Sequence, residues 1–186
     1  MISFSISCDI MKLVILSDTH IKPGQSIISL LPEDLISIIK SSGLLIHAGD
    51  FETIECYNEL QSLIRIIAVY GDTDCSELVK LLPERRVIEV EGVKIGIIHK
   101  GQLTSDHTDG LRYLAKEMDV DILVFGHFHH PIVEKTDVLL LSPGSATVPG
   151  IAEPSAIELE IKDKSVKGKI IRCTGDVCSY FKYEKN

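Results

Sequence analysis

Short runs of hydrophobic residues, each closed by glycine or polar residues, organise the first two thirds of the chain. The runs are rich in Leu, Ile and Val and have the length of single strands, which is typical of strands buried on both faces. We expect such strands over residues 12–17, 44–48, 65–70, 93–98 and 120–125. A further run over residues 86–90 is expected to pair with 93–98 in a hairpin that turns at Glu91-Gly92.

Segments between these strands have the spacing of amphipathic helices. A helix that begins at Pro32 would place Leu35, Ile38 and Ile39 on one apolar face. The other helices are expected over residues 54–63, 76–82 and 106–118, with Thr53 as the N-cap of the first and Ser105 or Asp106 as the N-cap of the last. Strands that alternate with helices predict an α/β fold.

The pattern changes after residue 131, where strands follow one another without helices between them. We expect these strands over residues 132–135, 138–141, 155–162, 166–172 and 177–183. Because glycine and polar turn residues separate most of them, the last third is predicted to be antiparallel β. The whole pattern fits two β-sheets packed as a sandwich with helices on the outer faces. No repeat or linker divides the chain, so we expect one domain over residues 1–186, in which residues 1–10 form an extra edge strand or precede the natural start at Met11.

Composition and charge exclude several classes of partner. The chain has 186 residues, of which 45% are hydrophobic and 25% charged, as in ordinary globular proteins. Its net charge of −8 argues against nucleic acid as a partner, because binding to the phosphate backbone requires clustered Lys and Arg. No hydrophobic run approaches the roughly 20 residues that span a bilayer, so no membrane partner is expected. The five cysteines are scattered and no signal peptide precedes them, which predicts a cytoplasmic protein with reduced thiols.

The ends of five expected strands carry Asp and His residues. Asp18 and His20 follow the first strand, Asp50 the second, Asp72 the third, His99 the fourth, and His127 and His129 the fifth. In open α/β sheets the ligand crevice lies beyond the carboxyl ends of the strands. Residues 18 and 20 are two apart, as are 127 and 129, so the members of each pair would point the same way on an extended segment. Two such pairs could hold one cation with Asp50 as a bridging ligand, and Asp72 and His99 would complete a second cation site.

This donor set indicates a transition metal. Mixed carboxylate and imidazole ligands suit Mn, Fe, Zn or Co better than Ca or Mg. No cysteine stands at these strand ends, which argues against a structural zinc site. His47, which lies within a strand, and His130 are interpreted as structural residues. Asp74 either orients a metal ligand or caps the helix that begins near residue 76.

The order of these motifs along the chain resembles a known superfamily. The motifs are Asp18-x-His20, Gly49-Asp50, Gly71-Asp72-Thr73-Asp74, His99 and Gly126-His127-x-His129. Together they resemble the calcineurin-like metallophosphoesterase superfamily over residues 12–162. The length of the chain and Pro143-Gly144-Ser145 resemble its small prokaryotic phosphodiesterase branch, to which the retromer scaffold subunit also belongs. The resemblance implies an α/β fold in the form of a four-layer αββα sandwich, two mixed β-sheets flanked by helices, with a two-metal centre between the sheet edges.

The resemblance also implies a ligand set and a reaction. Metal one would take Asp18, His20, Asp50 and His129, and metal two would take Asp50, Asp72, His99 and His127, so that these seven residues form the catalytic site. The cofactors would be two divalent transition-metal ions, Mn first and otherwise Ni, Co, Fe or Zn. The implied function is hydrolysis of a small phosphoester, most readily a phosphodiester, by in-line attack of a metal-bridging hydroxide. The alternative is a metal-binding protein-interaction scaffold of the same fold with little or no turnover, and either could form a homodimer or homo-oligomer.

Two features depart from the family pattern. The family has Asn where this chain has Asp72, so three carboxylates would leave two divalent cations with a formal charge of +1 instead of +2. A less positive centre would attract an anionic substrate less and would acidify its water less. Family members with a strong general acid carry His at the position of Thr73, and His99 is followed here by Lys100-Gly101. Lys100 and His107 are candidate substrate contacts.

Overall fold

Two six-stranded β-sheets form the centre of the computed structural model, which describes residues 2–4, 10–100, 108–173 and 177–184. The first sheet has the strand order β1-β5-β6-β7-β9-β8. Its strands are β1 (Ile2–Phe4), β5 (Arg85–Val90), β6 (Val93–Ile98), β7 (Ile122–Val124), β9 (Leu139–Pro143) and β8 (Pro131–Lys135). The central strands β6, β7 and β9 are parallel, whereas β5 and β8 pair antiparallel with their neighbours β6 and β9.

The second sheet has the strand order β12-β11-β10-β2-β3-β4. Its strands are β12 (Val177–Glu184), β11 (Ser165–Arg172), β10 (Ser155–Lys162), β2 (Met11–Leu16), β3 (Leu44–His47) and β4 (Ile66–Ala68). Strands β2, β3 and β4 are parallel, and β10 to β12 continue the sheet in antiparallel fashion. The carboxyl ends of β2 to β4 therefore meet at one edge of this sheet.

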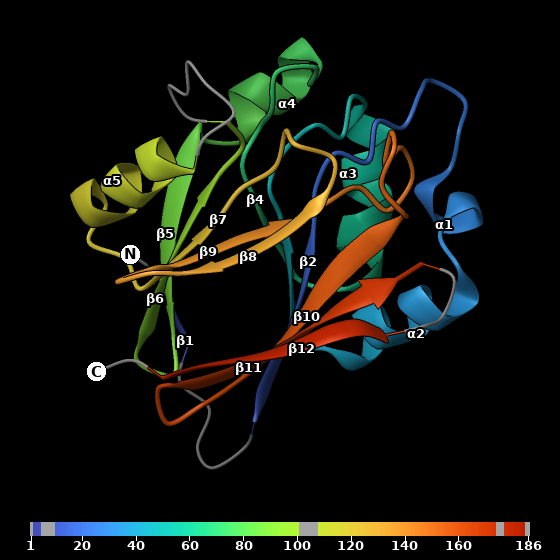
Figure 1. Ribbon diagram of the computed structural model, residues 1–186. Coiled ribbons are helices and arrows are strands. Elements are labelled where there is room, and N and C mark those ends of the chain that lie inside the picture. Colours follow the sequence, from blue (N-terminus) through green and yellow to red (C-terminus); the bar gives the residue numbers. More distant parts are fainter. Residues whose placement is uncertain (1, 5–9, 101–107, 174–176, 185–186) are drawn as a thin grey trace.

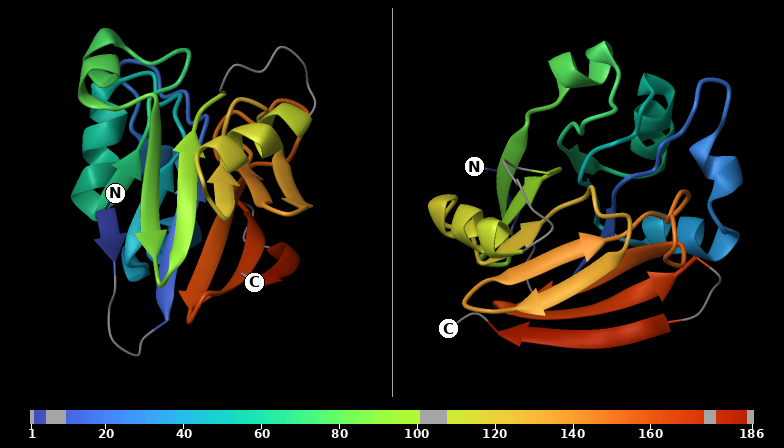
Figure 2. Two further views of the ribbon diagram at one scale, coloured as in Figure 1. Left: turned by 90° about the vertical axis from the view of Figure 1, so that its left-hand side faces the viewer. Right: turned by 45° about the horizontal axis from the view of Figure 1, so that its top comes forward.

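Helices cover the outer face of each sheet, so the molecule has four layers (Figures 1 and 2). The helices are α1 (Ile27–Leu30), α2 (Glu33–Ser41), α3 (Ile54–Leu63), α4 (Ser76–Leu81) and α5 (Asp109–Glu117). Buried residues of α1 to α4 pack on the sheet that contains β2 to β4, and those of α5 pack on the sheet that contains β6 and β7. The α/β fold with two mixed sheets flanked by helices, predicted from the sequence, is confirmed.

Strand β2 shows why the sequence carries continuous hydrophobic runs. Leu13 and Ile15 belong to the core between the two sheets, whereas Val14 and Leu16 belong to the core under the helices. All four side chains are fully buried. A strand covered on both faces needs apolar residues at every position, not at alternate positions. Burial of each such side chain stabilises the fold by about 1.5–3 kcal/mol, which holds the strand ends in fixed positions.

Several expected elements are confirmed. The side chain of Thr53 caps α3 and accepts a hydrogen bond from the backbone N–H of Cys56. The hairpin between β5 and β6 turns at Glu91 and Gly92, and both residues have positive φ. Residues 2–4 form an edge strand that is paired with β5.

Other predictions need correction. The last third of the chain is not purely antiparallel, because β8 and β9 form a hairpin that returns β9 parallel to β7 and extends the first sheet. Helix α1 was not expected, since four residues are too few to show a helical period. The described part of α5 begins at Asp109, and the expected caps Ser105 and Asp106 lie outside the described residues. None of the helices in the described part of the chain is long and apolar enough to cross a bilayer.

Candidate metal centre

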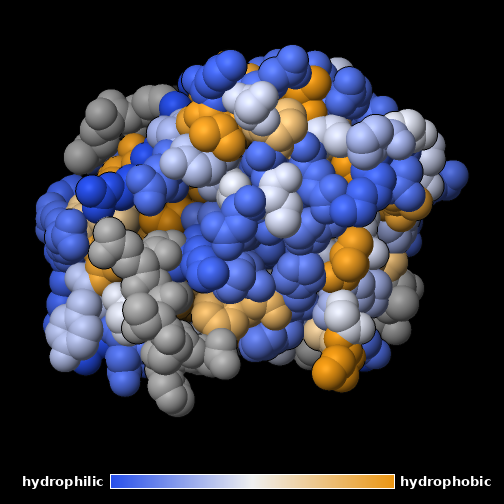
Figure 3. All heavy atoms as spheres, turned by 90° about the horizontal axis from the view of Figure 1, so that it is seen from above, coloured by the Kyte–Doolittle hydropathy of each residue, from blue (hydrophilic) through white to orange (hydrophobic). Residues whose placement is uncertain are grey.

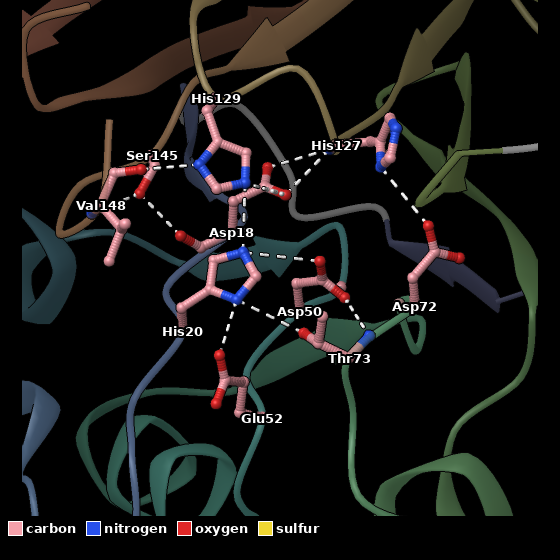
Figure 4. A network of polar contacts seen from close by, with 12 residues as sticks. Asp18, His20, Asp50, Glu52, Asp72, Thr73, His127, His129, Ser145 and Val148 are labelled. Carbon is pink, nitrogen blue, oxygen red and sulfur yellow. Dashed lines mark hydrogen bonds and ion pairs between the residues drawn. The ribbon is translucent and has the colours of Figure 1, made fainter. Parts of the chain in front are cut away.

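Strands of both sheets deliver polar residues to one place. Asp18, Asp50 and Asp72 follow β2, β3 and β4 of the second sheet, in that order. His99 follows β6 of the first sheet, and the pair His127 and His129 follows β7. Figure 4 shows how six of these side chains approach one another between the two sheets, those of Asp18, His20, Asp50, Asp72, His127 and His129. The structure therefore brings together all seven residues that the sequence singled out.

Left-handed backbone conformations turn these side chains toward the centre. Asp18, His20, Asp50, His127 and His129 have φ values of 53°, 44°, 61°, 73° and 58°. The prediction that residues 18 to 20 and 127 to 129 are extended is thus wrong. Residues other than glycine adopt this backbone conformation at a cost of roughly 1–2 kcal/mol each. Strained backbone of this kind concentrates at functional sites, where the surrounding structure enforces it.

The first cluster consists of Asp18, His20 and His129. Nε2 of His20 lies 3.1 Å from Nε2 of His129, and the two imidazole rings are stacked with their centroids 4.9 Å apart. Nε2 of His129 also lies 3.6 Å from Oδ1 of Asp18. The three side chains converge closely enough to bind one cation.

The second cluster consists of Asp72, His99 and His127. Nδ1 of His127 lies 3.4 Å from Oδ2 of Asp72, and the three side chains also converge closely enough to bind one cation. The side chains of His127 and His129 therefore point to different clusters, although the spacing of the two residues had predicted that they would point the same way. Its two imidazoles belong to different clusters, because each residue turns the chain by its own left-handed conformation.

Asp50 stands between the two clusters. Its Oδ2 lies 3.2 Å from Nε2 of His99 and 3.5 Å from Nε2 of His20. Its Oδ1 accepts a hydrogen bond from the backbone N–H of Thr73 at 2.8 Å, which leaves Oδ2 directed at both clusters. Asp50 is 3% exposed, so this carboxylate is almost fully shielded from water. It therefore has the position that a bridging ligand requires.

Hydrogen bonds fix the tautomers of three histidines. Nδ1 of His20 donates to Oε1 of Glu52 at 2.9 Å. Nδ1 of His99 donates to the carbonyl of Ala48 at 2.8 Å, and Nδ1 of His129 donates to the carbonyl of Val148 at 2.6 Å. Because carbonyl and carboxylate oxygens only accept hydrogen bonds, Nδ1 carries the proton in all three rings. In the neutral form of each ring, the lone pair is then on Nε2 and faces the centre, as in histidines that bind metals.

Nε2 of His99 is the clearest sign that a cation fits here. This atom is buried and makes no hydrogen bond within the described residues, although Oδ2 of Asp50 is close to it. Burial opposes the charged imidazole, but the carboxylate of Asp50 raises the pKa of His99 to about 9. Burial also opposes the charged form of Asp50, yet His99 and Thr73 hold the pKa of Asp50 well below its usual range. The centre therefore attracts positive charge, which a proton or a metal ion can supply.

Asp74 organises the loops that carry Asp50 and Asp72. Its carboxylate accepts hydrogen bonds from the backbone N–H groups of Gly71 at 2.7 Å, Glu52 at 2.8 Å and Asp50 at 3.2 Å. Helix α4 is capped by Cys75 without a side-chain hydrogen bond. Of the two alternatives for Asp74, the structure therefore has the one in which it orients candidate ligands.

Gly71 and the turn after β9 pack directly against these loops. A Cβ atom at Gly71 would lie 2.2 Å from Oδ1 of Asp50, so only glycine fits at this position. Oγ of Ser145 donates to the carbonyl of Asp18 at 2.6 Å, and Oγ of Ser17 donates to the carbonyl of Gly144 at 3.0 Å. The turn at 143–145 thus contacts the first ligand loop, and it holds the backbone of Asp18 in place.

Glu52 and Lys22 also belong to the site, although the sequence pattern did not indicate them. Glu52 orients His20, and Nζ of Lys22 donates to both carboxylate oxygens of Glu52 at 2.6 and 2.7 Å. The position of Glu52, two residues after Asp50, was the signal available in the sequence. Residues expected to be structural or to contact substrate are placed as follows. His47 is fully buried and its Nδ1 accepts a hydrogen bond from the N–H of Gly49, whereas His130 is exposed. Of the two candidate substrate contacts, Lys100 has its Nζ 3.6 Å from Oδ2 of Asp72. The other, His107, lies outside the described residues.

Two cavities open beside the centre. One has a volume of about 490 Å³ and is bordered by Asp72, His99 and Lys100. The other has a volume of about 370 Å³ and is bordered by His20 and Val148. Figure 4 shows His20 and Val148 on one side of the centre and Asp72 on the other. A ligand held at the centre can therefore extend in two directions.

Comparisons with known proteins agree with this geometry. The family described as "Calcineurin-like phosphoesterase superfamily domain" matches residues 11–164. A "Probable metallophosphoesterase" of Methanothermobacter thermautotrophicus is 34% identical over 176 residues, which are 94% of this chain and 100% of that protein. A protein of Methanocaldococcus jannaschii named as a phosphodiesterase is 27% identical over 170 residues, 82% of this chain and 96% of that protein. The structure of vacuolar protein sorting 29 from Cryptosporidium parvum has the same fold, with a TM-score of 0.82, 24% identity, and coverage of 95% of this chain and 99% of that one.

Proposed function

Because this chain belongs to the calcineurin-like phosphoesterase superfamily, we propose that it is a metal-dependent phosphodiesterase acting on a small phosphoester. The observation that carries this proposal is the position of Asp50, whose Oδ2 lies within 3.5 Å of a histidine from each cluster. One buried carboxylate that faces two groups of imidazoles is the arrangement expected of a bridging ligand between two cations.

The donor atoms suggest how two divalent ions would be held. Asp18, His20 and His129 would bind one ion, Asp72, His99 and His127 would bind the other, and Asp50 would bind both. The orphaned Nε2 of His99 and the three fixed tautomers fit this arrangement. Mn is the metal that we propose first, with Ni, Co, Fe or Zn as alternatives, because carboxylate and imidazole donors suit these ions.

The chain itself contributes orientation and charge to the reaction. Two bound cations would supply Lewis acidity and an activated water molecule that attacks phosphorus in line. Glu52 and the carbonyls of Ala48 and Val148 hold the Nε2 lone pairs of three histidines toward the centre. Lys100 places a positive charge at the edge of the larger cavity, where it can attract a phosphoryl oxygen. Thr73 offers no general acid, so substrates with good leaving groups suit this site best.

The two cavities favour a diester over a monoester. A phosphodiester carries two organic groups on one phosphorus, and the cavities bordered by Asp72 and by His20 lie on opposite sides of the centre. Each cavity has the size of a small-molecule site. We further propose, from the sequence, that the protein works in the cytoplasm and assembles as a homodimer or homo-oligomer.

The proposal is tested by hydrolysis of bis(p-nitrophenyl) phosphate. Purified protein is expected to release p-nitrophenol when Mn²⁺ is added and to lose this activity in the presence of EDTA, because the bound cations would supply the activated water molecule. The assay is repeated with Ni²⁺, Co²⁺, Fe²⁺ and Zn²⁺. The absence of turnover above the Asp50→Ala variant with all five metals would contradict the proposal.

That negative result would favour a scaffold. The likeness of fold to vacuolar protein sorting 29 is the observation that supports this second candidate, a metal-binding protein-interaction module with little or no turnover. The first candidate is stronger, because the seven predicted ligands are all Asp or His and converge in the structure.

Asp72→Asn is expected to increase activity. With two divalent ions bound, the substitution would raise the formal charge of the centre from +1 to +2 and would release Lys100 from its contact with the carboxylate. We expect kcat/KM for bis(p-nitrophenyl) phosphate to rise by about threefold or more, because a more positive centre stabilises a developing negative charge better. Asp34→Asn, a substitution of an exposed residue on α2, is the matched control. An unchanged rate with every metal would contradict this charge argument and leave the fold unaffected.

A further inference from the structure

The smaller of the two cavities differs in chemistry from the larger one. It lies between the segment around α1 and the loop that follows Gly144, and it has a volume of about 370 Å³. Its apolar lining includes Ile21, Leu30, Pro32, Ala146, Val148 and Pro154. Thr19 and His20 form the wall that it shares with the metal centre. None of the described residues that line it is Asp, Glu, Lys or Arg, whereas the larger cavity is lined by both acidic and basic side chains.

Hydrogen bonds tie the walls of the small cavity to the ligand loops. The N–H of Ile21 donates to the carbonyl of Phe51 at 2.9 Å, and the side chain of Ile21 is buried. Oγ1 of Thr147, in the loop that follows Gly144, donates to the carbonyl of Thr19 at 2.5 Å. The carbonyl of Val148 accepts the hydrogen bond from Nδ1 of His129. The same loop therefore forms one side of the cavity and orients a predicted ligand, so the cavity has a fixed position relative to the centre.

Two apolar side chains at this cavity are exposed to water. Leu30 is 49% exposed and Val148 is 45% exposed. Seen from above, the molecule has a largely hydrophilic surface on which hydrophobic residues form small separate patches (Figure 3). An apolar group that entered the cavity would remove its own surface and that of these side chains from water, which is favourable in proportion to the apolar area buried. A charged group would lose hydration there without gaining an ionic partner.

We propose that this cavity binds an apolar organic arm, such as an aryl or branched alkyl group, of the phosphoester whose phosphoryl group is held at the metal centre. The inference rests on the proposed function, because the metal centre supplies the site for the phosphoryl end. The other arm of a diester would extend into the larger cavity beside Asp72 and Lys100 and would be polar. The preferred substrates are therefore phosphodiesters with two unlike arms, one apolar and one polar.

Binding of two phosphonates to the Mn²⁺-loaded protein tests the inference. Benzylphosphonate and methylphosphonate share a phosphonate group and differ in the apolar arm, and isothermal titration calorimetry measures the Kd of each. We expect benzylphosphonate to bind about tenfold more tightly, because part of its ring becomes buried. Leu30→Asp is expected to reduce this preference below about threefold, because it places a charge in the lining. Leu30→Ala is expected to give an intermediate preference, because it leaves less apolar surface there. Leu81→Asp, at a leucine that is 56% exposed on α4, is the matched control and is expected to keep the preference.

The outcomes separate this inference from the proposed function. An equal affinity for the two phosphonates, the absence of binding, or a preference that Leu30→Asp leaves unchanged would overturn the inference. Hydrolysis of bis(p-nitrophenyl) phosphate without a preference for the benzyl compound would overturn the cavity assignment and leave the proposed function standing. A preference that depends on Leu30 in a protein without hydrolytic activity would overturn the proposed function and leave the cavity as a ligand site.

Discussion

Asp50→Ala is expected to lower kcat for bis(p-nitrophenyl) phosphate by at least about 1,000-fold, because the carboxylate that would join the two cations is removed. Within the described residues, Asp50 has a carboxylate oxygen within 3.5 Å of a histidine in each cluster. Its loss leaves each cluster with a single carboxylate, that of Asp18 or that of Asp72, to stabilise a cation. The rate is measured at saturating Mn²⁺, and the metal content of the purified variant is measured by mass spectrometry. We expect the bound metal to fall to one ion or fewer per chain.

Two controls make this result specific. Asp34→Ala removes an exposed carboxylate from α2 and is expected to leave rate and metal content unchanged. Circular dichroism and a urea titration report whether Asp50→Ala is folded, since Asp50 also accepts a hydrogen bond from Thr73. A folded Asp50→Ala protein that keeps both the wild-type rate and two bound ions would show that the clusters are not bridged by this residue.

Asp74→Ala is expected to have the second largest effect, a loss of stability and of metal affinity, although Asp74 belongs to neither cluster. Its carboxylate binds the backbone N–H groups of Asp50, Glu52 and Gly71, which lie in two different loops. Alanine leaves these donors without their acceptor, and each unsatisfied buried donor costs about 1–3 kcal/mol. We expect the free energy of unfolding to fall by about 2–4 kcal/mol, because water can replace part of the lost hydrogen bonding. The urea midpoint measures this change.

The same substitution is expected to weaken metal binding. Groups that orient ligands without touching the metal typically contribute about 10- to 100-fold to metal affinity, so the Kd for Mn²⁺ should rise by that factor. Isothermal titration calorimetry measures the Kd below the temperature at which the variant unfolds. Glu77→Ala on α4, at an exposed acidic residue three positions away, is the control; it should leave the Kd unchanged and lower the free energy of unfolding by no more than about 1 kcal/mol, the contribution of an acidic residue in the first turn of a helix. An unchanged Kd in the folded Asp74→Ala protein would show that Asp74 supports only the stability of the loops.

The local pattern of residues was enough to predict most strands and helices. Runs such as residues 12–17 are apolar throughout because both faces of β2 are buried, and this signal does not depend on any distant contact. Thr53 before a helical segment and Glu91-Gly92 between two strands act within a few residues of themselves, so they too could be read directly. The four-residue helix α1 gave no periodic signal, and its position depends on packing against the sheet.

Pairing between distant strands was less predictable. The sequence predicted a series of strands after residue 131, but it did not indicate that β8 and β9 extend one sheet while β10 to β12 extend the other. Hydrogen bonds between strands are made by the backbone, which is the same for every residue except proline. The side chains of β9 therefore indicate that the strand is buried, but they do not indicate that the neighbouring strand β7 is parallel to it.

The sequence by itself determined which residues stand at the strand ends, and with them the seven candidate ligands and the type of metal that they suit. The tertiary structure groups these residues in two clusters, which the family resemblance implied and which the spacing of the residues did not indicate. Five of them are turned by left-handed backbone conformations, which send His127 and His129 to different clusters and leave Asp50 between the two. The spacing of residues along the chain cannot contain this information, because the conformations are imposed by contacts with distant segments such as Ser145 and Gly71. The roles of Glu52, Asp74 and the apolar cavity follow from the same cause, since each depends on loops that meet only in the folded protein.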